Sequence, residues 1–308
     1  MFASGALASA PLTADEFDFE LGAGFGASDF SDTSSNGFSF SDHTDTFSLV
    51  GRWYYDGLDD NGHPRSRAPF LDRTSSLSLT YVRTDQESVS GLPAPMFGPV
   101  STTLISETEI EAIELGLRHV WPASGWFGLA SYVRSDTDGT GQLIVDGEPP
   151  VIGSGSENAS TYSLGVGKYL WTNTSVQFVV TEFDVGSIDA FSVDDGRAYD
   201  LSVSHVGSIN DSWSFAVDAS VSQFDFDFGG DADGYALAVS LLPGNALEFG
   251  VGYSNLELDD FNEDQIYDVF ASWFVRENIE IRARYQDLDS QNSFFDTDGF
   301  DVGVNVRF

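Results

Sequence analysis

Apolar residues alternate with polar or small residues along most of this chain. The last segment, 299–308, is the clearest case, because every second position from Phe300 to Phe308 is apolar and the positions between hold Asp, Gly, Asn and Arg. Successive side chains of a β-strand point to opposite faces, so the segment predicts a strand with one apolar face and one polar face. Such an apolar face meets either a protein core or lipid, and the rest of the chain has to distinguish the two.

Similar runs recur from residue 16 to the end, separated by clusters of Gly, Asp, Asn, Ser and Pro, so the sequence predicts an all-β chain. The predicted strands are 16–27, 46–55, 76–84, 109–121, 126–135, 160–171, 175–183, 197–207, 212–224, 234–242, 246–255, 265–275, 279–288 and 299–308. Most have the length of a tilted membrane-crossing strand, whereas globular strands average about five or six residues. The pattern predicts a transmembrane antiparallel β-barrel of about 14 strands, or 16 if the segment 142–152 adds a hairpin.

The connections alternate between short turns and long loops. The long ones are 86–104, 136–158, 184–196, 225–233 and 289–298. Short turns at one end and long loops at the other are typical of outer-membrane barrels. The segment 56–74 is the exception, because it falls on the short-turn side, yet it is long and contains Pro64 and Pro69. Either this segment forms an excursion at the periplasmic end, or the strand count is wrong by one hairpin at this point. No pattern indicates whether any loop folds inward.

The tryptophans test the barrel interpretation independently. All six lie near strand ends on the short-turn side: Trp53, Trp121, Trp126, Trp171, Trp213 and Trp273. A barrel places amphipathic aromatic rings at the headgroup level of the membrane, whereas a soluble sandwich has no reason to gather them at one end. We therefore interpret them as an aromatic girdle.

The alternation also assigns faces. Apolar positions such as Phe17, Phe19, Leu79 and Ile113 are predicted to face lipid. The alternate positions are predicted to line the pore: Asp18, Glu20, Arg52, Glu114, Arg118, Arg134, Asp200, Asp218, Glu248, Asp268, Glu280, Arg282, Arg284 and Arg307. So many charges suit a water-filled lumen better than a packed core, because buried charges need partners.

Composition narrows the possible partners. The chain has 308 residues, 13 Lys plus Arg against 49 Asp plus Glu, and a formal net charge of -36. This charge opposes binding to nucleic acid. Cysteine is absent, which excludes disulfides and thiolate metal sites. Residues 1–14 include a small, apolar Ala-Ser-Ala segment that is similar to a signal-peptide cleavage region, so we predict a processing remnant or disordered terminus there and a single barrel domain over 15–308.

Two segments carry resemblances to known families. The final strand with its terminal Phe308 resembles the C-terminal assembly signal of Gram-negative outer-membrane β-barrel proteins. The stretch "RAPFLDRTSSLSLTYVR" at 67–83 is similar to a segment of predicted porins from marine gammaproteobacteria. These resemblances imply localisation in the cell outer membrane, contact with the lipid bilayer and lipopolysaccharide, insertion by the barrel assembly machinery, and passive diffusion of small solutes.

Three Asp-x-Asp-Gly motifs are the only candidates for metal binding, and we expect no other cofactor. Their aspartates are Asp136, Asp138, Asp231, Asp233, Asp296 and Asp298. Closely spaced carboxylates beside a glycine turn can bind Ca²⁺ or Mg²⁺ weakly, but Asp and Gly are also ordinary turn residues, and none of the motifs has the full EF-hand pattern. The predicted long loops would hold all three on the extracellular side.

The sequence therefore predicts a porin-like channel for small hydrophilic solutes and ions. Acids at the mouths predict a modest cation preference, whereas a lumen governed by Arg282, Arg284 and Arg307 would reverse it. Arg52, Arg118 and Arg134 are predicted to form a second basic group, and all of these arginines could equally be paired within the wall. The alternatives are a non-conducting barrel with acidic extracellular loops for adhesion or surface structure, and a soluble acidic β-protein. No nucleophile motif indicates an enzyme, and association into oligomers is left open.

Overall fold

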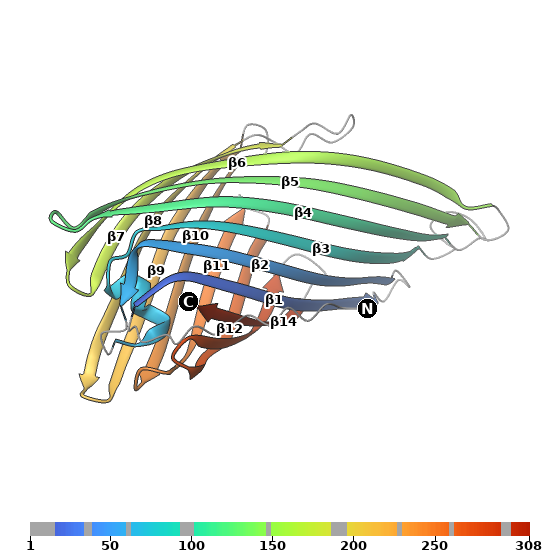
Figure 1. Cartoon of the computed structure of the whole chain (residues 1–308). Coiled ribbons are helices and arrows are strands. Elements are labelled where there is room, and N and C mark those ends of the chain that lie inside the picture. Colours follow the sequence, from blue (N-terminus) through green and yellow to red (C-terminus); the bar gives the residue numbers. More distant parts are fainter. Residues whose placement is uncertain are drawn as a thin grey trace, which may run out of the picture.

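The chain forms a closed barrel of fourteen antiparallel strands (Figure 1). The computed structural model describes residues 16–33, 39–59, 63–92, 102–145, 149–185, 196–226, 230–258, 262–290 and 297–308. The strands are β1 (Glu16–Thr33), β2 (Ser39–Asp59), β3 (Ser76–Leu92), β4 (Thr102–Trp121), β5 (Trp126–Val145), β6 (Val151–Trp171), β7 (Thr174–Val185), β8 (Gly196–Asn210), β9 (Trp213–Phe226), β10 (Gly230–Pro243), β11 (Leu247–Leu258), β12 (Asn262–Arg276), β13 (Ile279–Ser290) and β14 (Thr297–Arg307). Each strand pairs with its neighbours in sequence, and β1 pairs with β14 to close the barrel. The prediction of fourteen strands is confirmed.

The barrel wall is uneven in height. Strands β1–β6 contain 17 to 21 residues, whereas β7–β14 contain 11 to 15. The far ends of β5 and β6 project beyond the rest of the barrel (Figure 1). The segment 142–152 contributes to the end of this hairpin, where Leu143 pairs with Val151, so the sixteen-strand alternative is wrong. The Asp-x-Asp-Gly motif at 136–139 lies within β5 rather than in a loop.

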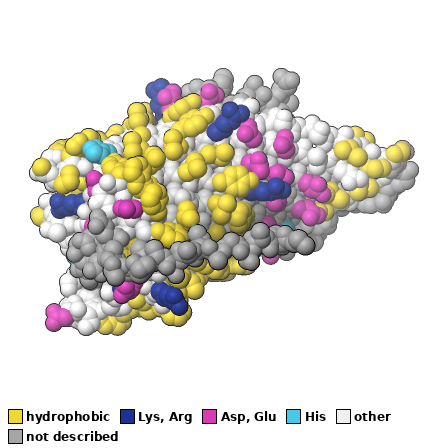
Figure 2. All heavy atoms as spheres, in the orientation of Figure 1, with side chains coloured by type: hydrophobic (Ala, Val, Ile, Leu, Met, Phe, Trp, Pro, Cys, Tyr) yellow, Lys and Arg dark blue, Asp and Glu magenta, His cyan; other side chains and the backbone are white. Residues whose placement is uncertain are grey.

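The outward face carries the apolar side chains predicted to meet lipid. Leu79, Ile113 and Leu115 are 48 to 55 % exposed, and all six tryptophans are 40 to 68 % exposed. In β4 the outward apolar stretch runs from Ile113 to Trp121, which is the length that a tilted strand needs to cross a membrane. Hydrophobic side chains gather over the middle of the face that the space-filling view shows (Figure 2).

Phe17 departs from the predicted pattern. The pairing of β1 with β2 shifts between Phe17 and Phe19, which is a β-bulge. Four residues of β2 (54–57) lie opposite the single residue Asp18 of β1, and this odd offset reverses the face of the residues beyond it. Phe17 is accordingly 5 % exposed and packs with Tyr54, Leu58 and Ala68 inside the barrel, so the prediction that it faces lipid is wrong.

The connection between β2 and β3 enters the short-turn end of the barrel. We call its described part, residues 63–75, the crossing segment. It contains a 3₁₀ turn η1 (Arg65–Arg67) and a single helical turn α1 (Ala68–Leu71). Pro64 precedes η1 and Pro69 lies in the first turn of α1, where a proline nitrogen needs no hydrogen-bond partner. No helix in the described ranges is both long and apolar enough to cross a membrane.

Three small apolar clusters hold the crossing segment against the wall. Ala68 packs against the cluster at β1 and β2, and Phe70 packs against Val120, Phe127 and Tyr169 of β4–β6. Phe70 and Leu71 also pack against a third cluster on β8–β10, formed by Val206, Ala216 and Leu242. The buried apolar core of the described chain is therefore concentrated at this end, where it fixes the crossing segment inside the lumen.

Candidate functional site: the lumen and its crossing segment

Arg67 attaches the crossing segment to the far wall of the lumen. Its Nη1 donates to Asp218 Oδ2 at 2.8 Å, and its Nη2 donates to Glu248 Oε1 at 2.6 Å. The Glu248 side chain is 6 % exposed, so it depends on Arg67 and on the hydroxyl of Ser240, which donates to it at 2.6 Å. Burial lowers the pKa of Arg67, but the two carboxylates outweigh it and raise the pKa above its usual value. Arg67 is therefore a fixed positive charge between β9 and β11.

Hydrogen bonds to the backbone secure the rest of the crossing segment. The Arg65 N–H donates to Asn245 O at 2.9 Å, and Arg307 Nη1 of β14 donates to Arg65 O at 3.0 Å. On the opposite side, Tyr169 Oη of β6 donates to Phe70 O at 2.9 Å. Arg73 donates to Trp171 O at 3.1 Å, and its guanidinium lies over the Tyr169 ring. These attachments reach both sides of the barrel, so the segment spans the lumen.

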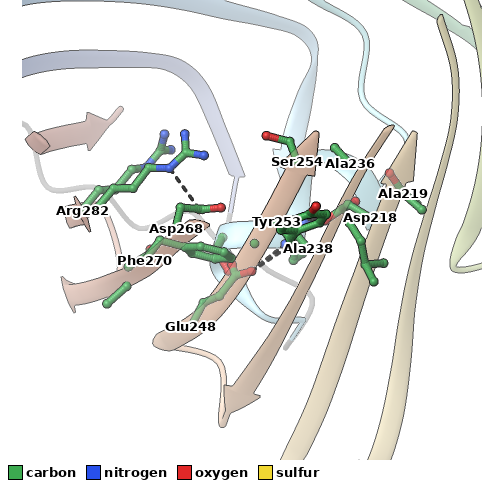
Figure 3. A pocket seen from close by; sticks show the side chains of 18 of the residues that line it. Asp218, Ala219, Ala236, Ala238, Glu248, Tyr253, Ser254, Asp268, Phe270 and Arg282 are labelled. Atoms are coloured by element: carbon green, nitrogen blue, oxygen red, sulfur yellow. Dashed lines mark hydrogen bonds and ion pairs between the residues drawn. The ribbon is translucent and has the colours of Figure 1, made fainter. Parts of the chain in front are cut away.

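Two cavities remain on either side of the crossing segment. One has a volume of about 670 Å³ and lies against β8–β14, and the other has a volume of about 530 Å³ and lies against β2–β7. Ser66 and Arg67 line both cavities and separate them. Figure 3 shows the cavity of about 670 Å³ from close by. Arg282 and Asp268 lie on one side of this cavity, and Asp218 lies on its other side. The segment therefore divides the short-turn end of the lumen without filling it.

Most of the predicted pore-lining charges face inward, but they occur in pairs. Glu20 and Arg307 are 2.8 Å apart and each side chain is 4 % exposed, so this pair is buried where β1 meets β14. Arg52 lies 3.4 Å from Glu20. Two further inward ion pairs are Arg282–Glu280 at 2.9 Å and Arg284–Asp268 at 3.1 Å. Most of the arginines in the two predicted basic groups are therefore paired with acids of the barrel wall, as the second alternative expected.

Three inward residues have neighbours of other kinds. Arg118 lies over the Phe127 ring and donates to the hydroxyl of Tyr169. Asp200 accepts a hydrogen bond from Ser222 at 3.0 Å. Glu114 lines the smaller cavity together with Arg52 and Arg118. The second basic group thus retains Arg52 and Arg118 on one wall.

Two predictions of pore-lining residues are corrected. Arg134 pairs in register with the exposed Ile113, which places it on the outward face, where it contacts Asp136 at 3.3 Å. Beyond the apolar belt, outward positions are charged as well, so polarity no longer identifies the inward face. Asp18 lies at the bulge of β1 and is exposed, and its N–H donates to Phe308 O, so it lies at the short-turn rim rather than along the lumen.

The Asp-x-Asp-Gly motifs are not brought together. Asp136 and Asp138 belong to β5, Asp231 and Asp233 to β10, and Asp298 to β14, whereas Asp296 lies outside the described residues. Within the described ranges, no group of three His, Asp or Glu side chains is arranged to hold a metal ion. The terminal Phe308 is 40 % exposed and pairs with the backbone of Phe19.

Sequence reasoning missed Arg67 and Tyr169 as the residues that position the crossing segment. A signal was available, because Arg65, Arg67 and Arg73 concentrate three of the 13 basic residues in one connection on the short-turn side. Basic residues gathered in a turn of a strongly acidic chain indicate that acidic partners lie elsewhere in the fold.

The fold is similar to that of solved structures at low sequence identity. The outer membrane protein Omp33 of Acinetobacter baumannii aligns with a TM-score of 0.55 and 15 % identity, over 96 % of this chain and 100 % of that chain. A deltaS2 mutant of the monoaromatic hydrocarbon channel TodX aligns with a TM-score of 0.56 and 11 % identity, over 96 % and 91 % of the two chains. No protein-family model and no curated protein sequence matches the chain. The fold is thus that of outer-membrane β-barrels.

Proposed function

We propose that this protein is a porin-like channel of a Gram-negative outer membrane, through which small hydrophilic solutes and ions diffuse passively. One observation carries the proposal: the inward face is charged and polar around two cavities, and the segment that crosses the lumen leaves both of them in place. Cavities of several hundred Å³ lined by polar groups accommodate small solutes and water. The apolar outward belt and the exposed tryptophans support lipid and lipopolysaccharide as its surroundings.

We further propose a modest preference for cations. Inside the lumen, most arginines are matched by carboxylates, so they contribute little net field. On the outward face beyond the apolar belt, β3–β5 carry an acidic band, in which Arg83 and Arg134 are the basic residues. Its acids are Asp85, Glu87, Glu107, Glu109, Glu111, Asp136 and Asp138. Figure 2 shows acidic side chains gathered between the hydrophobic belt and the projecting end of the barrel. Such a band raises the local cation concentration at the mouth.

The crossing segment supports a second candidate, a non-conducting barrel that serves adhesion or surface structure. A segment attached to β6, β9, β11 and β14 closes part of the short-turn end. In that case the tall wall of β1–β6 would be the functional part. Insertion by the barrel assembly machinery is expected for both candidates, and the terminal Phe308 resembles its signal.

The deciding experiment measures current across a planar bilayer that contains the purified protein, under a salt gradient. The channel proposal expects stepwise conductance with a reversal potential on the cation side.

The variant Arg67→Gln, which loses both carboxylate contacts, is expected to conduct more, because the crossing segment is released from β9 and β11. The variant Arg134→Gln is the matched control, since Arg134 lies outside the lumen. A folded barrel that passes no current as wild type and also as Arg67→Gln would favour the non-conducting candidate. An anion-side reversal potential would refute the cation preference.

A further inference from the structure

We propose that the larger cavity contains a binding subsite for zwitterionic solutes that carry a carboxylate and an ammonium group, as free amino acids do. This inference rests on the proposed channel function, because the solute reaches the subsite through the lumen. The subsite consists of Arg282, Arg284 and Asp301, which all line the cavity of about 670 Å³.

Arg282 and Arg284 supply the positive pole. They occupy alternate positions on the inward face of β13, so their side chains project side by side into the cavity. Arg282 donates through Nη2 to Glu280, and Arg284 donates through Nε to Asp268. A guanidinium has five N–H donors, and these two side chains are 50 % and 46 % exposed. After each has formed its wall pair, it retains donors that face the cavity.

Exposure separates these two arginines from Arg307 and Arg67. Arg307 is 4 % exposed and is occupied by Glu20, and Arg67 is 22 % exposed and is held by two carboxylates. Those arginines maintain the wall and the crossing segment. Arg282 and Arg284 are the pair that a carboxylate in this cavity can contact in the bidentate or bridged manner that guanidinium groups favour.

Asp301 supplies the negative pole. It lies directly opposite Arg284 in the pairing of β13 with β14, and its side chain is exposed. Arg284 is nevertheless paired with Asp268 on its other side, and Arg282 and Arg284 act on Asp301 through electrostatic attraction rather than through a side-chain hydrogen bond. Asp301 also lines a neighbouring cavity of about 360 Å³, so its carboxylate lies at the junction of the two spaces. An ammonium group can therefore approach it.

Glycines keep the adjacent wall open. Gly303 is the partner of Arg282 across β13 and β14, and Gly24 is the partner of Gly303 across β14 and β1. These inward positions carry no side chain, so the wall beside the arginine pair is backbone there, and Gly24 lines the neighbouring cavity of about 360 Å³. The subsite thus combines two half-free guanidiniums, one carboxylate and room for a small molecule.

The charge of the mouth favours a zwitterion over a simple anion. A free carboxylate or phosphate ion approaching from the projecting end meets the exposed acidic band and is repelled by it. A solute with an added ammonium group is neutral overall and avoids this repulsion. It can then place its carboxylate on Arg282 and Arg284 and its ammonium group on Asp301.

The test is saturation-transfer difference NMR on the protein in deuterated detergent micelles, with three matched probes in slightly acidic buffer. Alanine carries both groups, lactate lacks the ammonium group, and alaninamide lacks the carboxylate. We expect the alanine signal to exceed those of lactate and alaninamide by about fivefold, because it gains two charge-assisted contacts at once. Equal signals for the three probes on the wild-type protein would overturn the proposal without recourse to any variant.

Variants then assign the two poles. Arg284→Gln is expected to reduce the alanine signal to the level of alaninamide, and Asp301→Asn is expected to reduce it to the level of lactate. The matched control Arg134→Gln, an arginine on the outward face, is expected to retain the wild-type signal. Folded variants at Arg284 and Asp301 that keep the full alanine signal would also overturn the proposal. Because binding in micelles requires no current, failure of this subsite and failure of the channel function are separately visible.

Discussion

The two ends of the barrel use charged side chains in different ways. At the short-turn end, Glu20 and Arg307 are each 4 % exposed and 2.8 Å apart, and Arg67 reaches two carboxylates from inside the lumen. At the far end, Arg83 and Arg134 also contact acids, but their side chains are 42 % and 58 % exposed. The distances are similar, so burial rather than geometry is the main difference between the two ends.

This difference separates charges that specify structure from charges that set a field. A buried charge that loses its partner remains desolvated, so a buried pair strongly disfavours any arrangement in which the partners are apart. An exposed pair is screened by water and salt and contributes little to stability. The short-turn pairs therefore hold the crossing segment and the β1–β14 closure, whereas the far-end charges influence which ions accumulate at the mouth.

The largest expected effect comes from breaking the most buried pair. Arg307→Gln should lower the free energy of unfolding by about 3–5 kcal/mol, because Glu20 would be left with Arg52 at 3.4 Å and the Tyr54 hydroxyl at 3.5 Å. The far-end counterpart Arg134→Gln should change it by no more than about 0.5 kcal/mol. Urea titration of the folded barrel in lipid vesicles measures both values. Similar losses for the two variants would remove the distinction between the ends.

The next largest effect is expected at the crossing segment. Arg67→Gln should lower the free energy of unfolding by about 2–3 kcal/mol, which is less than for Arg307 because Asp218 is 35 % exposed and can be rehydrated. Arg67→Lys should give an intermediate loss, since an ammonium group retains the charge but not the two-sided reach of a guanidinium. The same urea titration applies. If the lysine variant loses as much free energy of unfolding as the glutamine variant, then the geometry of the guanidinium rather than its charge holds the segment.

Packing gives a comparison within a single strand. In β6, a Cβ at Gly167 would come 2.2 Å from the Phe127 ring, which lies in the apolar cluster under the crossing segment, whereas a Cβ at Gly155 would meet nothing within 4 Å. Gly167→Ala should therefore destabilise the barrel by about 1–3 kcal/mol through overpacking. Gly155→Ala should be neutral or stabilise it by about 0.5 kcal/mol. Equal effects in thermal unfolding would contradict the packing difference.

The two ends also differ in how far the sequence predicted them. Strand number and outward face followed from alternation, because the apolar belt between Ile113 and Trp121 in β4, and its equivalents, require lipid on one side. Alternation failed at Phe17, where a bulge reverses the faces, and at Arg134, where both faces are polar beyond the belt. The crossing segment could not be placed, because its partners Asp218 and Glu248 lie more than a hundred residues away in the chain. Long-range ion pairs leave no periodic signal.

The smallest effect on stability should accompany a clear effect on selectivity. Replacing Glu107, Glu109 and Glu111 of β4 by Gln removes three acids from the outward band. Glu109 pairs with the exposed Arg83, and Glu111 accepts a hydrogen bond from the exposed Tyr81. The free energy of unfolding should therefore change by less than about 0.5 kcal/mol per residue.

The reversal potential of this triple variant should nevertheless move toward zero at low salt, because the mouth loses part of its negative field. At about 1 M salt the Debye length is about 3 Å, so the triple variant and the wild type should become indistinguishable. Glu277→Gln is the matched control at the short-turn end, where the Glu277 side chain is 78 % exposed beside Arg65. If the control shifts the reversal potential as much per charge as the triple variant does, then the tall wall has no special role in selection. If only the triple variant shifts it, then the projecting wall is the cation-selecting part of the mouth, because its acids are exposed and largely uncompensated.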